Sequence, residues 1–168
     1  TSYLMFTVGI DPGSSGAIAV LDSLNPDSIA LLDLKKHSIF EISSWLTSHL
    51  HKNIEYEEDA ITKIWVEDIH SMYGMSARSN FGFGRNLGTV LTISEMLTGV
   101  TPGMVAPKVW QKYIGVTAKG KAIKKQVAKI AQHIFPHAEL HGKRGGLLDG
   151  RSDALMIAYY GLHHKEKV

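Results

Sequence analysis

The sequence predicts an α/β or α+β domain built around a mixed sheet. Three observations predict this class: three short apolar runs open the chain, helix-like and strand-like patterns then alternate, and helical patterns close it. With 168 residues, of which 44% are hydrophobic, the chain has the size of one ordinary domain and can bury a sizeable core. We therefore expect a single domain that spans residues 1–168.

The first three elements are predicted to be antiparallel strands. The apolar runs that predict them are Leu4 to Ile10, Ala17 to Leu21 and Ile29 to Leu34. Short segments rich in Gly, Asn, Pro and Asp separate these runs, as is typical of hairpins. Apolar residues at helical spacing then predict a helix over 39–50, and the segment 62–66 predicts a fourth strand.

The second half of the chain is predicted to be mostly helical. Its expected elements are a helix over about 79–97, a strand over 101–106, a helix that Pro107 opens, a helix after Lys119 that Pro136 ends, and a final helix over about 150–162. Small and apolar residues give the final helix a narrow face for close packing: Ala154, Ile157, Ala158 and Gly161. This order of elements matches the ribonuclease H-like fold, a mixed five-stranded sheet flanked by helices.

Composition excludes several kinds of protein and site. No stretch approaches the roughly 20 uncharged apolar residues of a membrane span, and the N-terminus lacks signal-peptide character, so we expect a soluble intracellular protein. The absence of cysteine excludes disulfides, thiol nucleophiles and zinc–thiolate sites. The net charge of +2 does not by itself indicate nucleic-acid binding, but the segment 108–129 holds seven lysines and no acid.

Four carboxylates stand where the predicted elements would bring them together. Asp11 ends the first strand and Glu67 ends the fourth, so these two acids meet if the strands are neighbours. Asp149 and Asp153 are four residues apart and share a face if both lie on the final helix. Crowded carboxylates repel one another unless cations neutralise them. Two Mg²⁺ ions about 4 Å apart would stabilise both the attacking and the leaving oxygen at phosphorus, so the pattern predicts phosphodiester hydrolysis.

Each acid also has a simpler explanation when it is considered alone. Asp11 is a common type of turn residue before Pro and Gly. Glu67 could be a solvated acid at a strand end, and Asp149 could be the N-cap of the final helix. Asp153 could interact only with the dipole of that helix. The four acids favour a metal site because they occur together.

Several motifs resemble those of RuvC-type Holliday junction resolvases, in the same order and context. The three that carry the acids are Val8-Gly9-Ile10-Asp11-Pro12-Gly13, Val66-Glu67 and Ser152-Asp153-Ala154-Leu155. Asn86-Leu87-Gly88, Pro107-Lys108-Val109 and the 119–121 region extend the resemblance over nearly the whole chain. The resemblance implies a single ribonuclease H-like nuclease domain in which Asp11, Glu67 and Asp153 are metal-binding catalytic acids.

The fourth acid departs from the usual pattern of that family. Bacterial members usually have Asp or His three residues before the last acid, where this chain has Gly150. Asp149 stands four residues before it, which looks more like phage-encoded members. We therefore take Asp149 as the fourth catalytic and metal-binding acid, with its interpretation as a helix cap left open.

The resemblance also implies the activity and its surroundings. We expect an endonuclease of DNA recombination and repair that cleaves four-way and other branched DNA with two Mg²⁺ ions, which Mn²⁺ can replace. A homodimer would match the near two-fold symmetry of a four-way junction. The expected location is the cytoplasm of a bacterium or of a phage-infected host cell, with no membrane partner.

Lysines of the acid-free segment are the candidates for contacts with DNA phosphates. They are Lys108, Lys119, Lys121, Lys124 and Lys125. In resolvases of this kind, a basic residue near the start of the final helices assists catalysis at the scissile phosphate. Lys119, Lys121 or Lys124 could take that role, and spacing does not choose between them.

Aromatic and histidine side chains after Glu67 are candidates for stacking on unpaired bases. These are His70, Tyr73 and Phe81, although packing of Phe81 in the core explains that residue equally well. The helix that follows contains Gly84 and Gly88, whose spacing would let another backbone approach. By resemblance, this helix is a dimer interface or a wall of the substrate site.

Three alternative functions remain compatible with the sequence. Another ribonuclease H-like nuclease would act on RNA–DNA hybrids, flaps or transposon ends. The segment Asp11 to Gly16 also resembles the first phosphate loop of actin-like and sugar kinases, although those proteins need two such domains. A junction-binding protein without catalysis is favoured only if the four acids fail to converge.

Overall fold

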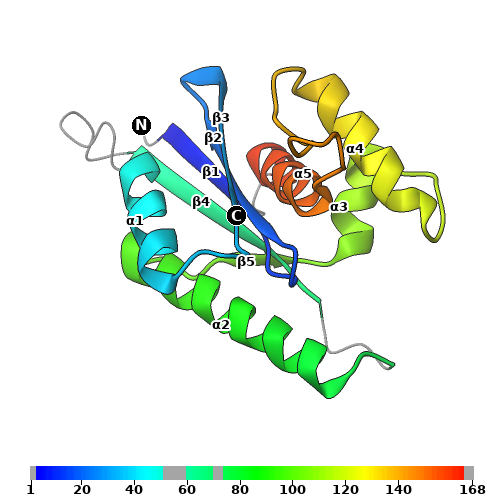
Figure 1. Cartoon of the computed structure of the whole chain (residues 1–168). Coiled ribbons are helices and arrows are strands. Elements are labelled where there is room, and N and C mark those ends of the chain that lie inside the picture. Colours follow the sequence, from blue (N-terminus) through cyan, green and yellow to red (C-terminus); the bar gives the residue numbers. More distant parts are fainter. Residues whose placement is uncertain (1–2, 51–59, 70–73, 165–168) are drawn as a thin grey trace.

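The computed structural model describes residues 3–50, 60–69 and 74–164. Five strands form one mixed sheet in the order β3-β2-β1-β4-β5 (Figure 1). The strands are β1 (Tyr3–Asp11), β2 (Ala17–Asp22), β3 (Asn25–Asp33), β4 (Ala60–Glu67) and β5 (Gly103–Val105). The helices are α1 (Ile39–Leu50), α2 (Ala77–Thr98), α3 (Pro107–Ile114), α4 (Ala122–Ile134) and α5 (Asp149–His163). The predicted fold class is confirmed.

The first three strands form the predicted antiparallel meander. β1 pairs with β2 from Phe6↔Asp22 to Asp11↔Ala17, and β2 pairs with β3. β3 begins at Asn25, four residues before the apolar run that predicted it. The residues 25–28 are exposed, so they carry none of the apolar alternation by which a half-buried strand is recognised.

β4 and β5 join the sheet in parallel, and this places the predicted acids at one edge. β4 runs parallel to β1 up to the pair Ile10↔Val66, so the residues that follow, Asp11 and Glu67, end adjacent strands at the same edge. β5 continues the parallel part by pairing with the end of β4. The carboxyl ends of β1, β4 and β5 therefore lie together.

The two faces of the sheet bury separate hydrophobic clusters. Alternate residues of β1, including Val8 and Ile10, pack with residues of α1 and α2 on one face. The other face packs against α5, and α3 and α4 contribute Trp110, Val127 and Ala131 to the same cluster (Figure 1). No helix in the part of the chain described here is both long and apolar enough to cross a membrane.

α5 is buried around much of its circumference, which differs from the narrow face that the sequence predicted. Its buried residues are Gly150, Ser152, Ala154, Leu155, Met156, Ile157, Ala158, Tyr160 and Gly161. The sheet covers one side of the helix, while α3 and α4 contact it as well. A helix that is apolar all round is one that lies between layers, so α5 is a central element of the core.

Glycine allows α5 to pack directly on the sheet. A Cβ atom at Gly9 of β1 would collide with the backbone of Ala154 and Ala158 in α5. A Cβ atom at Gly150 would collide with the carbonyl oxygen of Ser15, in the turn between β1 and β2. The start of α5 is therefore held against the strand and the turn that carry Asp11.

Gly9→Ala is expected to lower the free energy of unfolding by about 3 kcal/mol or more, because the added methyl group meets backbone atoms that cannot move without displacing α5. Gly84→Ala is the matched control, since a Cβ atom there meets nothing within 4 Å. That change is expected to raise stability by about 0.5–1 kcal/mol, as is usual for Gly to Ala inside a helix. Urea unfolding measures both, and equal stability of the two variants would contradict the close packing.

Candidate active site

Asp11 is both a turn residue and a buried acid. The N–H of Gly13 donates to its Oδ1 at 2.9 Å, and the N–H of Gly16 donates to the carbonyl of Gly13 at 2.9 Å to close the turn. The residue is nevertheless only 9% exposed. Burial raises the pKa of Asp11, the hydrogen bond from Gly13 opposes that rise, and the charge of Asp149 adds to it. The role in the turn accounts for one carboxylate oxygen but not for the burial of the group.

Glu67 is buried next to Asp11, so its interpretation as a solvated acid at a strand end is wrong. The residue is 4% exposed, and its Oε2 accepts a hydrogen bond of 2.8 Å from Nε1 of Trp110 in α3. Its pKa is raised to about 7, first by burial and then by the charge of Asp11, while the hydrogen bond from Trp110 opposes the rise. The predicted approach of Asp11 and Glu67 is confirmed.

Asp153 completes a group of three acids on this side of the sheet. It lies one turn into α5, whose first residues pack against the turn after β1. Its pKa is raised to about 9, chiefly by burial and then by the charges of Asp11, Glu67 and Asp149. Each of these charges acts on Asp153 through space, which shows that the four predicted acids converge on one region.

Asp149 is not the N-cap of α5. The N-cap position is Leu148, which makes no side-chain capping bond, and Asp149 is the first residue of the helix. Its Oδ2 lies 2.7 Å from Nζ of Lys124 in α4, and its side chain is 31% exposed. Asp149 is thus partly exposed, and it is joined to Lys124, the only lysine that forms an ion pair with the four acids among the described residues.

Lys124 is the basic residue that the structure brings to the acids. The hydrogen bond and charge of Asp149 raise its pKa, and the charges of Asp153 and Asp11 contribute further. Lys119 and Lys121 are exposed in the segment before α4. Of the three lysines that spacing left open, Lys124 is therefore the one that lies at the site.

The four carboxylates of the site fit a divalent cation. One ammonium group, that of Lys124, does not balance their negative charge, so a bound cation would reduce their mutual repulsion. Within the described residues, no three His, Asp or Glu side chains surround a common point as a ready-made metal cage. Mg²⁺ does not require one, because it keeps several waters and takes ligands from substrate phosphates. The residues could therefore hold the ion together with a nucleic-acid substrate.

The other predicted contacts are only partly placed by the structure. Lys108, Lys121 and Lys125 are exposed on or beside α3 and α4. Phe81 of α2 is 77% exposed, so its interpretation as a core residue is wrong and stacking on bases stays a prediction. His70 and Tyr73 lie outside the described residues.

Three residues support the acids without having been identified from the sequence. Trp110 orients Glu67, and Nδ2 of Asn86 in α2 donates to the carbonyl of Gly13 at 3.2 Å. Arg151 donates to both carboxylate oxygens of Asp33, at 2.8 and 3.0 Å, and so ties α5 to the end of β3. Asn86 and Arg151 lie within motifs that the sequence shows, but nothing in the local pattern reveals partners that are so distant in the sequence.

No protein-family model matches the sequence, and no curated protein matches it either. The structure is similar to that of Thermus thermophilus RuvC in complex with Holliday junction substrate, with a TM-score of 0.59, 18% identity, and coverage of 92% of this chain and 90% of that one. The chain has the RuvC fold. A second Thermus thermophilus RuvC structure gives a TM-score of 0.55 at 20% identity and covers 93% of this chain and 95% of that one. The RuvC fold thus extends over nearly the whole chain, as the order of motifs predicted.

Trp110→Phe is expected to raise the pKa of Glu67 above about 7, because the indole N–H that favours its charged form is removed while an aromatic ring stays in place. The variant should also lose about 1–3 kcal/mol of stability at pH 8, where the carboxylate would lack its donor. A carboxyl-carbon NMR titration measures the pKa. Trp45→Phe, on the opposite face of the sheet, is the control. An unchanged pKa in Trp110→Phe would show that the hydrogen bond does not act on Glu67.

The metal-free protein is expected to lose stability as the pH rises. Glu67 titrates at about 7 rather than 4.5, and Asp153 at about 9 rather than 3.8, in the folded protein. The folded state therefore binds more protons than the unfolded state between these values, so the free energy of unfolding falls from about pH 4 to about pH 9. Asp153→Asn should flatten this slope and raise stability at pH 8 by about 1–2 kcal/mol. Urea unfolding in EDTA over this pH range tests the prediction, with Asp22→Asn as the control. If Asp153→Asn leaves the dependence of the unfolding free energy on pH unchanged, the prediction is wrong.

Proposed function

We propose that this protein is an endonuclease that cleaves four-way and other branched DNA by metal-dependent phosphodiester hydrolysis. The observation that carries this proposal is the convergence of Asp11, Glu67, Asp149 and Asp153 at one edge of a RuvC-type sheet. A carboxylate site of this kind suits phosphoryl chemistry, in which cations neutralise developing charge. The RuvC structure that contains Holliday junction substrate supports the choice of branched DNA.

Mg²⁺ is the proposed cofactor, with Asp11, Glu67, Asp149 and Asp153 as the residues that would hold it. Two ions are proposed, with Mn²⁺ as a substitute, and the metal supplies an activated water and charge stabilisation at phosphorus. The chain itself fixes the ligands. Gly13 donates to Oδ1 of Asp11, and Trp110 donates to Oε2 of Glu67, which leaves the other oxygen of each carboxylate without these bonds.

Lys124 is the proposed basic residue that meets the scissile phosphate. Its ammonium group pairs with the partly exposed Asp149, and its side chain is 69% exposed. A phosphate bound beside the acids would therefore find this cation at the rim of the site. The exposed lysines of α3, α4 and the segment between them would hold more distant phosphates.

A homodimer is proposed because matched cuts on two strands need two active sites. α2 is the candidate for the interface or for a wall of the substrate site. Its surface is open at Gly84 and Gly88, where an added Cβ atom would meet nothing within 4 Å. Phe81 and Met96 of the same helix are also largely exposed.

The proposal predicts Mg²⁺-dependent cleavage of a synthetic four-way junction. Asp11→Asn and Asp153→Asn should each reduce the cleavage rate by about a thousandfold or more, as is usual when a charge-stabilising group is removed from an active site. Asp149→Asn should also abolish cleavage while junction binding and folding persist. Asp22→Asn is the matched control, because Asp22 ends β2 away from the four acids and its carboxylate accepts a hydrogen bond from the N–H of Leu24.

Cleavage is measured on labelled junctions, flaps, RNA–DNA hybrids and linear duplexes, with Mg²⁺, Mn²⁺ or EDTA. Absence of metal-dependent cleavage of branched DNA would refute the proposal, and preference for hybrids or flaps would favour a different ribonuclease H-like nuclease. Thermal unfolding provides a readout besides activity. Mg²⁺ should stabilise the wild-type protein at pH 8 more than it stabilises Asp153→Asn.

A further inference from the structure

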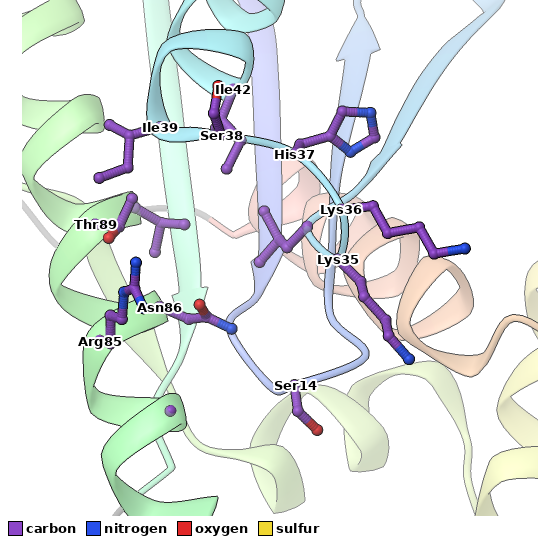
Figure 2. Close-up of a pocket in the computed structure, with 13 residues that line it drawn as sticks. Ser14, Lys35, Lys36, His37, Ser38, Ile39, Ile42, Arg85, Asn86 and Thr89 are labelled. Carbon is purple, nitrogen blue, oxygen red and sulfur yellow. The ribbon is translucent and has the colours of Figure 1, made fainter.

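Two cavities lie on either side of the turn between β3 and α1, next to the acids. The first has a volume of about 360 Å³ and lies between this turn and α2 (Figure 2). The second, of about 340 Å³, reaches Asp149 and Arg151 at the start of α5. Lys35 and Lys36 line both cavities, so the turn that carries them lies between the cavity beside α2 and the cavity that reaches Asp149.

The surface across these cavities has unbalanced positive charge. Arg85 of α2 lines the first cavity, and no acid within the described ranges of the chain lines it. Asp33 and Asp149 line the second cavity, but they are already paired with Arg151 and Lys124. Lys35, Lys36 and Arg85 are exposed and form no ion pair within the described residues. Three cations are therefore available to an anionic ligand.

The turn presents its lysines from a constrained backbone. Lys36 has a φ of 71°, and among the described residues it is the only residue other than glycine with a positive φ. Glycine or asparagine adopts this conformation with less strain than lysine. The turn is held by hydrogen bonds from the N–H of His37 to the carbonyl of Leu34 and from the N–H of Leu34 to the carbonyl of Gly16. A lysine in such a position points to a role for its side chain.

Both walls of the first cavity are bonded to the turn that holds Asp11. Asn86 of α2 donates to the carbonyl of Gly13, and the N–H of Leu34 donates to the carbonyl of Gly16. Figure 2 shows Ser14 at one end of the cavity, with Arg85 and Asn86 on one side and the basic turn on the other. The side chains of Lys35 and Lys36 point away from α2. The cations thus form a path from α2, over the turn, towards the acids.

We propose that Arg85, Lys35 and Lys36 form a phosphate track that binds the backbone of one DNA strand as it leaves the active site beside Asp149. This inference rests on the proposed function, since it assigns a path to the same substrate. Cations spread over two cavities and two elements suit an extended polyanion better than a single small anion. Phosphate contacts fix position without reading sequence, so the track would set which phosphodiester reaches the acids.

The first test removes two charges from the track. In Lys35→Gln/Arg85→Gln, the affinity for a fluorescent four-way junction should fall about tenfold at low salt, because two phosphate contacts are lost. The plot of log affinity against log salt concentration has a negative slope, and this slope should become less steep by about two for the same reason. Anisotropy in EDTA measures both quantities without cleavage. Lys143→Gln removes the charge of an exposed lysine that lines neither cavity, and it should bind like the wild type.

The second test uses the conformation of Lys36. Lys36→Gly should raise the melting temperature, because glycine tolerates the positive φ, and yet weaken junction binding, because the charge is lost. A purely structural turn would give higher stability with unchanged affinity. If the wild-type protein cleaves junctions but both track variants bind DNA with the salt dependence of the wild type, the track is overturned and the proposed function stands. Failure of the wild type to bind or cleave branched DNA would overturn both.

Discussion

Mutual repulsion among buried carboxylates is the constraint on which this structure depends. Asp11 and Glu67 are buried, and Asp153 beside them is half-buried. The charge of Asp11 disfavours the charged form of Glu67, and the charges of Asp11 and Glu67 disfavour that of Asp153. Lys124 offsets part of this repulsion from the rim. Because the repulsion would push unsupported side chains apart, the surrounding fold has to hold the acids in place while leaving room for cations.

The support comes from close backbone contacts and directed hydrogen bonds. Gly9 lets α5 rest on β1, so the helix that bears Asp153 cannot move away from the strand that ends at Asp11 without opening the core. Trp110 reaches Glu67 from α3, and Arg151 anchors the first turn of α5 to Asp33. Glu67 and the helix that bears Asp153 are therefore held by contacts with other elements, while Asp11 is held by its own turn through the N–H of Gly13. Preorganisation of this kind lowers the cost of rearranging charged groups during catalysis.

The sequence allowed most of the fold to be predicted, together with the convergence of the acids, because both depend on local patterns. Apolar runs located the strands, but they missed the exposed first half of β3. The acids Asp11 and Glu67 could be placed because each ends a recognisable strand. The capping interpretation of Asp149 failed because a helix boundary cannot be predicted to within a residue or two from the sequence. The ion-pair partner of Asp149, Lys124, lies on another helix and could not be predicted either. The roles of Trp110 and Arg151 depend on contacts between distant segments, which no periodicity encodes.

The central position of α5 has a consequence for the order in which the chain can fold. The helix occupies the end of the described sequence, yet it covers β1 and β2 near the beginning. During synthesis, these strands emerge well before residues 149–163 are available to cover them. One apolar face of the sheet then stays exposed until the last helix arrives, and exposed strand surfaces favour aggregation. Contacts between such distant segments also slow folding, so we expect the nascent chain to benefit from chaperones that cover the exposed face of the sheet.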